Sequence, residues 1–97
     1  MSSRRKELEA SWSRTRANLE KAFAQLPSFP RDGEEGGSVQ RYREWLDHNE
    51  LELALDELEL LGEANDAGKL FWESMLRTAT GMNLNAHAAR YREKVRG

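Results

Sequence analysis

Apolar residues recur along most of this chain at the spacing of an α-helix, with polar residues between them. Over residues 3–26 the apolar side chains are spaced 4, 7, 4 and 3 positions apart and share one narrow helix face: Leu8, Trp12, Leu19, Phe23 and Leu26. Pro27 and Pro30 end this helix, because proline cannot continue the backbone hydrogen-bond ladder. The pattern therefore predicts a long first helix with a single apolar face.

Residues 27–37 are the first break in this pattern. Two prolines and three glycines fall within these eleven residues, which predicts an irregular loop. Ser38 follows as the expected N-cap of a short second helix that runs to about His48. Asn49 is then the expected cap of a third helix, with Glu52 three positions later as in a capping box.

Further helix boundaries follow in the second half of the chain. Gly62 occupies the place expected for a left-handed residue at the end of the third helix. Asn65 or Asp66 is expected to cap a fourth helix, which ends near Gly81 or Met82.

A last short helix over residues 86–96 completes the set. No segment alternates with period two, and only five β-branched residues occur, so a sheet is not expected. We therefore predict an all-α fold. It is a single domain over residues 1–97, a compact bundle of four to five helices with no sheet, and the 27–37 loop separates its first and second helices.

The composition suits a small globular domain, since apolar residues are 38% and charged residues 33% of the 97. Cysteine is absent, so no disulfide holds the fold, which agrees with a reducing compartment. The first ten residues, MSSRRKELEA, are basic without an apolar stretch. No run approaches the roughly 20 apolar residues of a membrane span. We therefore expect a cytoplasmic protein that has no membrane partner.

Negative charge is concentrated in the middle of the chain. Residues 47–66 hold no lysine or arginine and eight acidic side chains: Asp47, Glu50, Glu52, Asp56, Glu57, Glu59, Glu63 and Asp66. The net charge of −2 does not reveal this acidic cluster. The rest of the chain is basic, because it holds the other nine of the 17 acidic residues and all 15 lysines and arginines. Like charges at this density repel one another. A partner with a basic surface would relieve the repulsion and associate faster through electrostatic steering.

The predicted third helix divides into distinct faces. Its core face is formed by Leu51, Ala54, Leu55, Leu58 and Leu61. Carboxylates form a second stripe beside it, whereas Leu53 and Leu60 project almost opposite the core. Either a neighbouring helix buries these two leucines, or they form an exposed apolar strip rimmed by carboxylates, as in many protein-binding surfaces. From this geometry we predict the partner-binding residues Glu52, Leu53, Asp56, Glu59, Leu60 and Glu63.

The residue types that carry chemistry do not converge in this sequence. Its two histidines, His48 and His87, are far apart, and His87 is expected to be a partly packed structural residue. The glycines of the 27–37 loop lie among acidic residues that would repel phosphate. Carboxylates on a convex helix lack the desolvated pocket of general acid and base catalysis. We therefore expect no catalytic residues, no metal site, no cofactor and no enzyme activity.

Nucleic acid is not an expected partner either. Basic residues open the chain and close it, and such termini can contact phosphates. Cations in the last turn of a helix, however, also complement the helix dipole. The acidic centre of the chain would oppose nucleic-acid binding.

Residues 39–84 resemble the bacterial MafI-type immunity proteins and related short helical immunity families. The resemblance lies in VQRYREWLDHNELELALDELELLGE and, after a polar break, FWESMLRTATGMNL. Within these segments a helix ends before His48, and a later helix closes with Gly81, Met82, Asn83 and Leu84. Phe29 followed by Pro30 also fits.

The resemblance implies a cytosolic antidote that binds and blocks a cognate toxin delivered by neighbouring cells. Immunity proteins against nuclease toxins are commonly acidic where they meet a cationic surface, which agrees with the acidic third helix. The alternative is a helical scaffold or regulatory protein. A homodimer through Leu53 and Leu60 is one form that such a protein would take.

Overall fold

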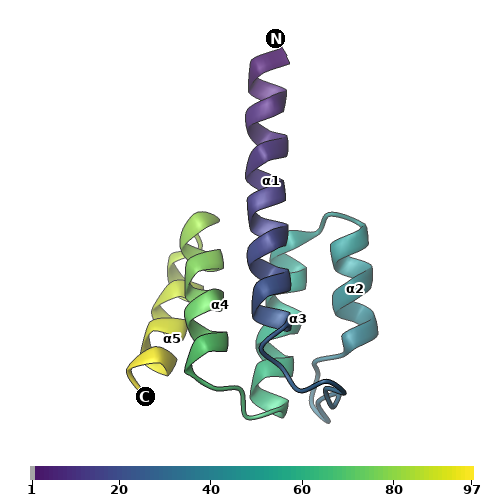
Figure 1. The fold of residues 1–97 in the computed structure, drawn as a ribbon, viewed down its shortest axis with the longest axis vertical. Coiled ribbons are helices and arrows are strands. Elements are labelled where there is room, and N and C mark those ends of the chain that lie inside the picture. Colours follow the sequence, from purple (N-terminus) through teal and green to yellow (C-terminus); the bar gives the residue numbers. More distant parts are fainter. Residues whose placement is uncertain (1) are drawn as a thin grey trace.

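The computed structural model describes residues 2–97, with side chains from Arg4 onward. Over this range it contains five helices and no strand (Figure 1): α1 Ser2–Phe23, α2 Val39–Asp47, α3 Leu51–Ala64, α4 Lys69–Gly81 and α5 Asn85–Arg96. Successive helices alternate in direction, so that α1, α3 and α5 run one way and α2 and α4 the other. The predicted all-α bundle is confirmed. No helix within residues 2–97 is long and apolar enough to cross a membrane.

Helices α3 and α4 form the centre of the bundle. Helix α3 packs against α2, α1 and α4, and α4 packs against α1 and α5 as well. The predicted core face of α3 is confirmed, because its five members are all buried: Leu51, Ala54, Leu55, Leu58 and Leu61. Gly62 extends this face inside the helix, where a Cβ atom would lie 2.3 Å from Cε1 of Phe71. The prediction that Gly62 ends α3 is therefore wrong, since the glycine makes room for an aromatic ring from α4.

The helix ends follow one recurring motif. Ser38 caps α2 as predicted, because its Oγ accepts a hydrogen bond from the backbone N–H of Arg41 at 3.2 Å. Asn49, Asp66 and Asn83 all have positive φ, at 57°, 49° and 60°. Each follows the end of a helix, and the next residue donates its N–H to the carbonyl five positions back, as in a Schellman motif.

Two predicted N-caps are therefore wrong. Asn49 ends α2 rather than beginning α3. Neither Asn65 nor Asp66 caps α4, because both stand at the C-terminal end of α3 and α4 begins after Gly68. Asn and Asp suit both places, because a short polar side chain can cap a helix N-terminus or tolerate the left-handed region. The predicted end of α4 near Gly81 is confirmed.

Helix α1 extends well beyond the bundle (Figure 1). Its C-terminal half is in the core, where Leu19 and Ala22 are completely buried. Leu8 and Trp12 share the same apolar face but are 48% and 42% exposed, because the other helices cover this face less completely toward the N-terminal end of α1. The predicted irregular loop at 27–37 is confirmed and lies at the opposite end of the bundle.

Candidate functional site

The carboxylate stripe of α3 faces α5. Three side-chain pairs bridge the two helices, and each joins residues 31 positions apart: Asp56 with His87, Glu59 with Arg90, and Glu63 with Lys94. The shared offset arises because α3 and α5 run in the same direction, so that one register aligns all three pairs. We call these six side chains the α3–α5 ladder.

Glu59 is the most buried carboxylate of the ladder, with an 18% exposed side chain. Arg90 donates from Nε and Nη2 to its two oxygens, both at 3.0 Å, and the Tyr91 hydroxyl donates to Oε1 at 2.6 Å. Burial by itself would raise the pKa of Glu59, but the hydrogen bonds from Arg90 and Tyr91 outweigh it, and the pKa lies below its ordinary value. Two-pronged charge-assisted bonding of this kind fixes the register of α5 on α3.

The hydrogen bonds of the ladder also affect the partners of Glu59. The pKa of Arg90 is raised by its hydrogen bond to Glu59. The pKa of Tyr91 is raised by burial of the ring and then by the same carboxylate. Tyr91 therefore remains a neutral donor, and Arg90 a cation, throughout the ordinary pH range.

The two outer pairs of the ladder are more open. Nε2 of His87 and Oδ1 of Asp56 are 2.7 Å apart, and the His87 ring packs edge-on against Tyr91. Lys94 Nζ is 3.3 Å from Glu63 and 5.2 Å from the centre of the Trp72 ring. About half of the Asp56 and Glu63 side chains is exposed, so each outer pair contributes less than the Glu59 pair.

Glu57 has a different structural role. This carboxylate is buried, and its Oε2 accepts the backbone N–H groups of Gly37 at 3.1 Å and Ser38 at 2.9 Å. It thereby ties the end of the 27–37 loop to α3, next to the positive N-terminal end of α2. A Cβ atom at Gly37 would lie 2.8 Å from the backbone carbon of Leu60, so the loop lies directly on this side of α3.

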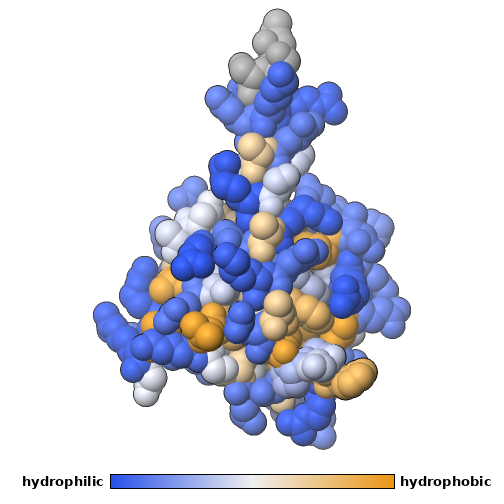
Figure 2. Space-filling view, viewed as in Figure 1, coloured by the Kyte–Doolittle hydropathy of each residue, from blue (hydrophilic) through white to orange (hydrophobic). Residues whose placement is uncertain are grey.

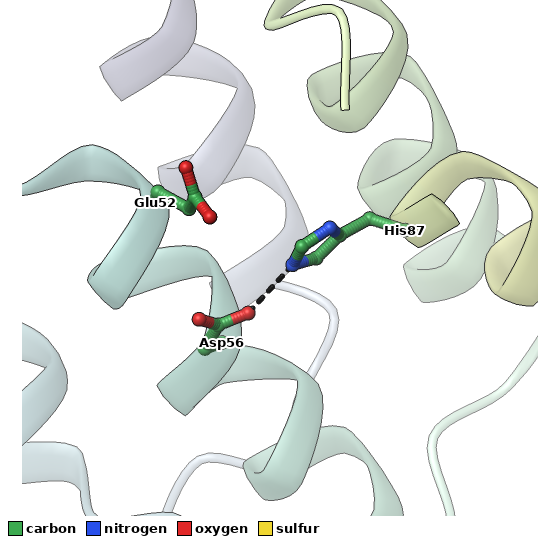
Figure 3. Close-up of side chains that lie close together, drawn as sticks. All are labelled: Glu52, Asp56 and His87. Atoms are coloured by element: carbon green, nitrogen blue, oxygen red, sulfur yellow. Dashed lines mark hydrogen bonds and ion pairs between the residues drawn. The ribbon is translucent and has the colours of Figure 1, made fainter. Parts of the chain in front are cut away.

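The outer end of the ladder brings three potential metal ligands together (Figure 3). Glu52 and Asp56, one turn apart on α3, point toward His87 of α5, and their ligand atoms all lie within 4.8 Å of one another. An imidazole with two carboxylates is a donor set that a divalent transition metal accepts. Here Asp56 already pairs with His87, and Glu52 is exposed beside them. That hydrogen bond by itself explains where the ring lies, and His87 is partly buried as expected.

Known proteins provide no further guide to this arrangement. No family model, curated protein or solved structure matches the chain. The site is therefore interpreted from its own geometry.

The structure divides the six predicted partner-binding residues between two sides of α3. Asp56, Glu59 and Glu63 point toward α5, where Glu59 and Glu63 form ion pairs and Asp56 shares a hydrogen bond with His87. Leu60 lies against the 27–37 loop, and Leu53, seven positions earlier, shares its face of α3; the two leucines are 42% and 41% exposed. Both leucines are therefore exposed, as in the second interpretation, and no neighbouring helix within residues 2–97 buries them. Glu52 is exposed, and no ion pair joins it to any side chain from Arg4 onward.

The expectation of a carboxylate stripe without nearby counter-charges is wrong for the ladder residues. Their counter-charges come from α5, far along the chain from α3. One signal in the sequence could have revealed them. The basic side chains at 87, 90 and 94 repeat the 3 and 4 spacing of the acidic ones at 56, 59 and 63, as two facing helices of the same direction require.

Exposed negative charge remains at the turn between α2 and α3. Asp47 and Glu50, which we call the acidic end, are exposed, and neither forms an ion pair with the side chains that the structure describes. Glu52 and the half-exposed Leu53 follow at the start of α3. This part of the acidic segment is the one still available to a partner.

Proposed function

We propose that this protein is a non-catalytic protein-binding module of the immunity-protein kind. In this proposal the start of α3 binds a partner that has a basic surface. The observation that carries the proposal is the state of the first turn of α3, where Glu52 is an exposed carboxylate with no ion pair to any side chain from Arg4 onward and the next residue, Leu53, is 41% exposed. An apolar anchor next to unpaired charge is a common composition for a protein interface.

The proposed surface is smaller than the stripe that the sequence predicts. Helix α5 already neutralises Glu59 and Glu63 and holds Asp56 through His87, so a partner would have to break existing contacts to use them. Breaking a partly buried charge pair is costly, because each charge is left without its partner. We therefore assign these three residues to holding the bundle together, and we retain Glu52, Leu53 and Leu60 for the partner.

The likeness to MafI-type immunity proteins supports a toxin as that partner. The similar segment, residues 39–84, includes α2, the α2–α3 turn and all of α3, which are the elements that carry the proposed surface. A toxin that acts on nucleic acid has a cationic surface, and an acidic antidote would be steered to it by long-range attraction. The protein would then act in the cytoplasm, by covering the surface with which the toxin meets its substrate.

Co-expression with the product of the gene immediately upstream tests this proposal. We expect that protein to be toxic alone and to co-purify with this one. Glu52→Lys combined with Leu53→Ala should weaken the complex by at least tenfold. Glu93→Lys is the matched control, because Glu93 pairs only with the exposed Arg96 and the charge change at that position is the same.

Two outcomes would overturn the proposal. One is an upstream product that is neither toxic nor bound. The other is a complex that the double variant leaves unchanged, which would place the interface elsewhere. Reversal of charge at Asp56 is unsuitable as a test, since it would also remove the bond between α3 and His87.

A further inference from the structure

The α3–α5 ladder changes its chemistry at its outer end. Glu59 and Glu63 each meet a permanent cation of α5. Asp56 meets the imidazole of His87 instead, and Nε2 of that ring lies 2.7 Å from Oδ1 of the carboxylate. A neutral imidazole does not cancel the charge of a carboxylate, but its free nitrogen lone pair is a metal ligand. This end of the ladder therefore combines uncancelled negative charge with a nitrogen donor.

Glu52 adds a second carboxylate at the same point. The 31-position offset of the ladder places position 83 opposite Glu52, whereas α5 begins only at Asn85, so the helix offers no cation at that level. The Glu52 carboxylate points toward His87 (Figure 3), and the ligand atoms of Glu52, Asp56 and His87 all lie within 4.8 Å of one another. No lysine or arginine from residue 4 onward forms an ion pair with either carboxylate. Two carboxylates thus converge on one imidazole.

We propose that Glu52, Asp56 and His87 bind one divalent transition-metal ion such as Zn²⁺. The charge of the ion balances the two carboxylates, and one atom from each side chain supplies three ligands, with water in the remaining position. The imidazole nitrogen favours such an ion over Mg²⁺ and Ca²⁺, which prefer oxygen ligands. The sequence predicts no metal site because its two histidines are far apart, and the register of α5 on α3 is what brings His87 to the carboxylates.

The neighbouring contacts of the ladder hold these ligands in place. Arg90 and Tyr91 donate three hydrogen bonds to Glu59, which fixes α5 on α3 one turn from the proposed site. The His87 side chain is only 15% exposed, and its ring packs edge-on against Tyr91. Ligands bound tetrahedrally at about 2.0–2.2 Å from an ion lie roughly 3.4 Å apart, a spacing that small side-chain movements reach here. Little conformational freedom is therefore lost when the ion binds.

Calorimetric titration of the full chain with Zn²⁺ alone tests the site. The wild type should bind one ion per chain. Glu52→Gln and His87→Ala should each weaken binding by about tenfold or more, because each removes a direct ligand and loss of an outer partner of a ligand already costs 10–100-fold. Glu52→Gln is the decisive variant, since Glu52 is exposed and forms no ion pair with the described side chains, so the bundle should stay folded.

Two matched controls remove the same chemical groups outside the site. His48→Ala removes the other imidazole of the chain, which is exposed at the end of α2. Glu50→Gln removes an exposed carboxylate two positions from Glu52, on another face of the helix. Both variants should leave the zinc affinity nearly unchanged, because exposed charges that do not touch the ion are screened by salt.

Two further measurements locate the ion. In nitrogen NMR spectra, Zn²⁺ should shift the Nε2 resonance of His87 and leave the ring of His48 unaffected. Saturating Zn²⁺ should raise the melting temperature of the wild type, because the ion joins α3 to α5 in the folded state only. The same concentration should have little effect on Glu52→Gln.

A wild-type chain that does not bind Zn²⁺ at millimolar concentration would overturn the proposal. So would an affinity that Glu52→Gln leaves unchanged, or a shift of the His48 ring in place of His87. The site shares Glu52 with the proposed function but does not rest on it, because the titration contains no partner. Zinc binding can fail while the partner is captured, and the reverse can also occur.

Discussion

Glu59 shows how one residue can have a different role from the one its sequence context suggests. In the sequence it is one of eight carboxylates without a basic neighbour. In the structure it accepts three hydrogen bonds from Arg90 and Tyr91 and connects α3 to α5. Its lowered pKa reflects these bonds, which outweigh the effect of burial.

Replacement of Glu59 by Gln should destabilise the protein by about 2 kcal/mol, the value typical of hydrogen bonds to a charged group. The amide keeps the shape of the side chain but removes the charge that Arg90 neutralises. Urea unfolding at neutral pH measures the change. Glu63→Gln is the matched control, and because its pair with Lys94 is half exposed, its loss should cost about 0.5 kcal/mol. Equal losses in the two variants would contradict the ranking of the ladder pairs.

The lowered pKa of Glu59 also predicts a dependence of stability on pH. The folded state binds the proton of Glu59 less readily than the unfolded chain, where the pKa is near its ordinary value of 4.5. The stabilisation is therefore complete above that value and is lost as the pH falls through the lower folded pKa. Urea unfolding between pH 7 and pH 3 should show this loss, and Glu59→Gln should make the decline shallower. An unchanged pH profile in the variant would exclude Glu59 as its source.

At the scale of the helices, packing requires a glycine in α3 but not in α4. Gly62 faces the ring of Phe71 inside α3, whereas nothing lies within 4 Å of a Cβ atom at Gly81, the last residue of α4. The fold thus requires the first glycine for packing and does not require the second.

Alanine at the two positions should have opposite effects. Gly62→Ala should destabilise the protein by about 1–3 kcal/mol, because overpacking against Phe71 exceeds the gain in helix propensity. Gly81→Ala should be neutral or stabilise by up to about 1 kcal/mol, since alanine restricts the unfolded chain. Thermal and urea unfolding of both variants measure the difference. A stabilised Gly62→Ala protein would mean that Phe71 can move aside.

At the scale of the whole molecule, the structure has a packed bundle and an extension of α1 (Figures 1 and 2). The core residues of α1 begin at Thr15, and residues 4–10 of the helix are all exposed. The long axis of the molecule, 45 Å against 29 and 21 Å for the other two, reflects this extension. Local stability should therefore be uneven along one continuous helix.

Amide hydrogen exchange should detect this unevenness. Amides of residues 5–10 should exchange much faster than those of α3, because the first turns of α1 can open without unfolding the bundle. Protection equal to that of α3 would show that these turns have support from the rest of the chain.

Much of this protein is determined by its sequence alone. The spacing of apolar residues predicts the helices, the irregular loop and the buried face of α3, because helix periodicity and turn chemistry act over a few neighbouring residues. The positions of Asn49 and Asp66 could not be interpreted correctly at that level, since the same side chains suit the beginning and the end of a helix. Only the bonding of the following residue decides between the two roles.

The tertiary structure alone decided which charges and which apolar side chains remain available. Pairing of α3 with α5 depends on helix directions and register over 31 residues, which no local pattern specifies. This pairing holds Asp56, Glu59 and Glu63 against α5. Glu52 and the acidic end are left without ion pairs to the side chains that the structure describes. The same holds for Leu8 and Trp12, because an apolar face follows from local spacing, whereas its burial depends on how far the neighbouring helices extend.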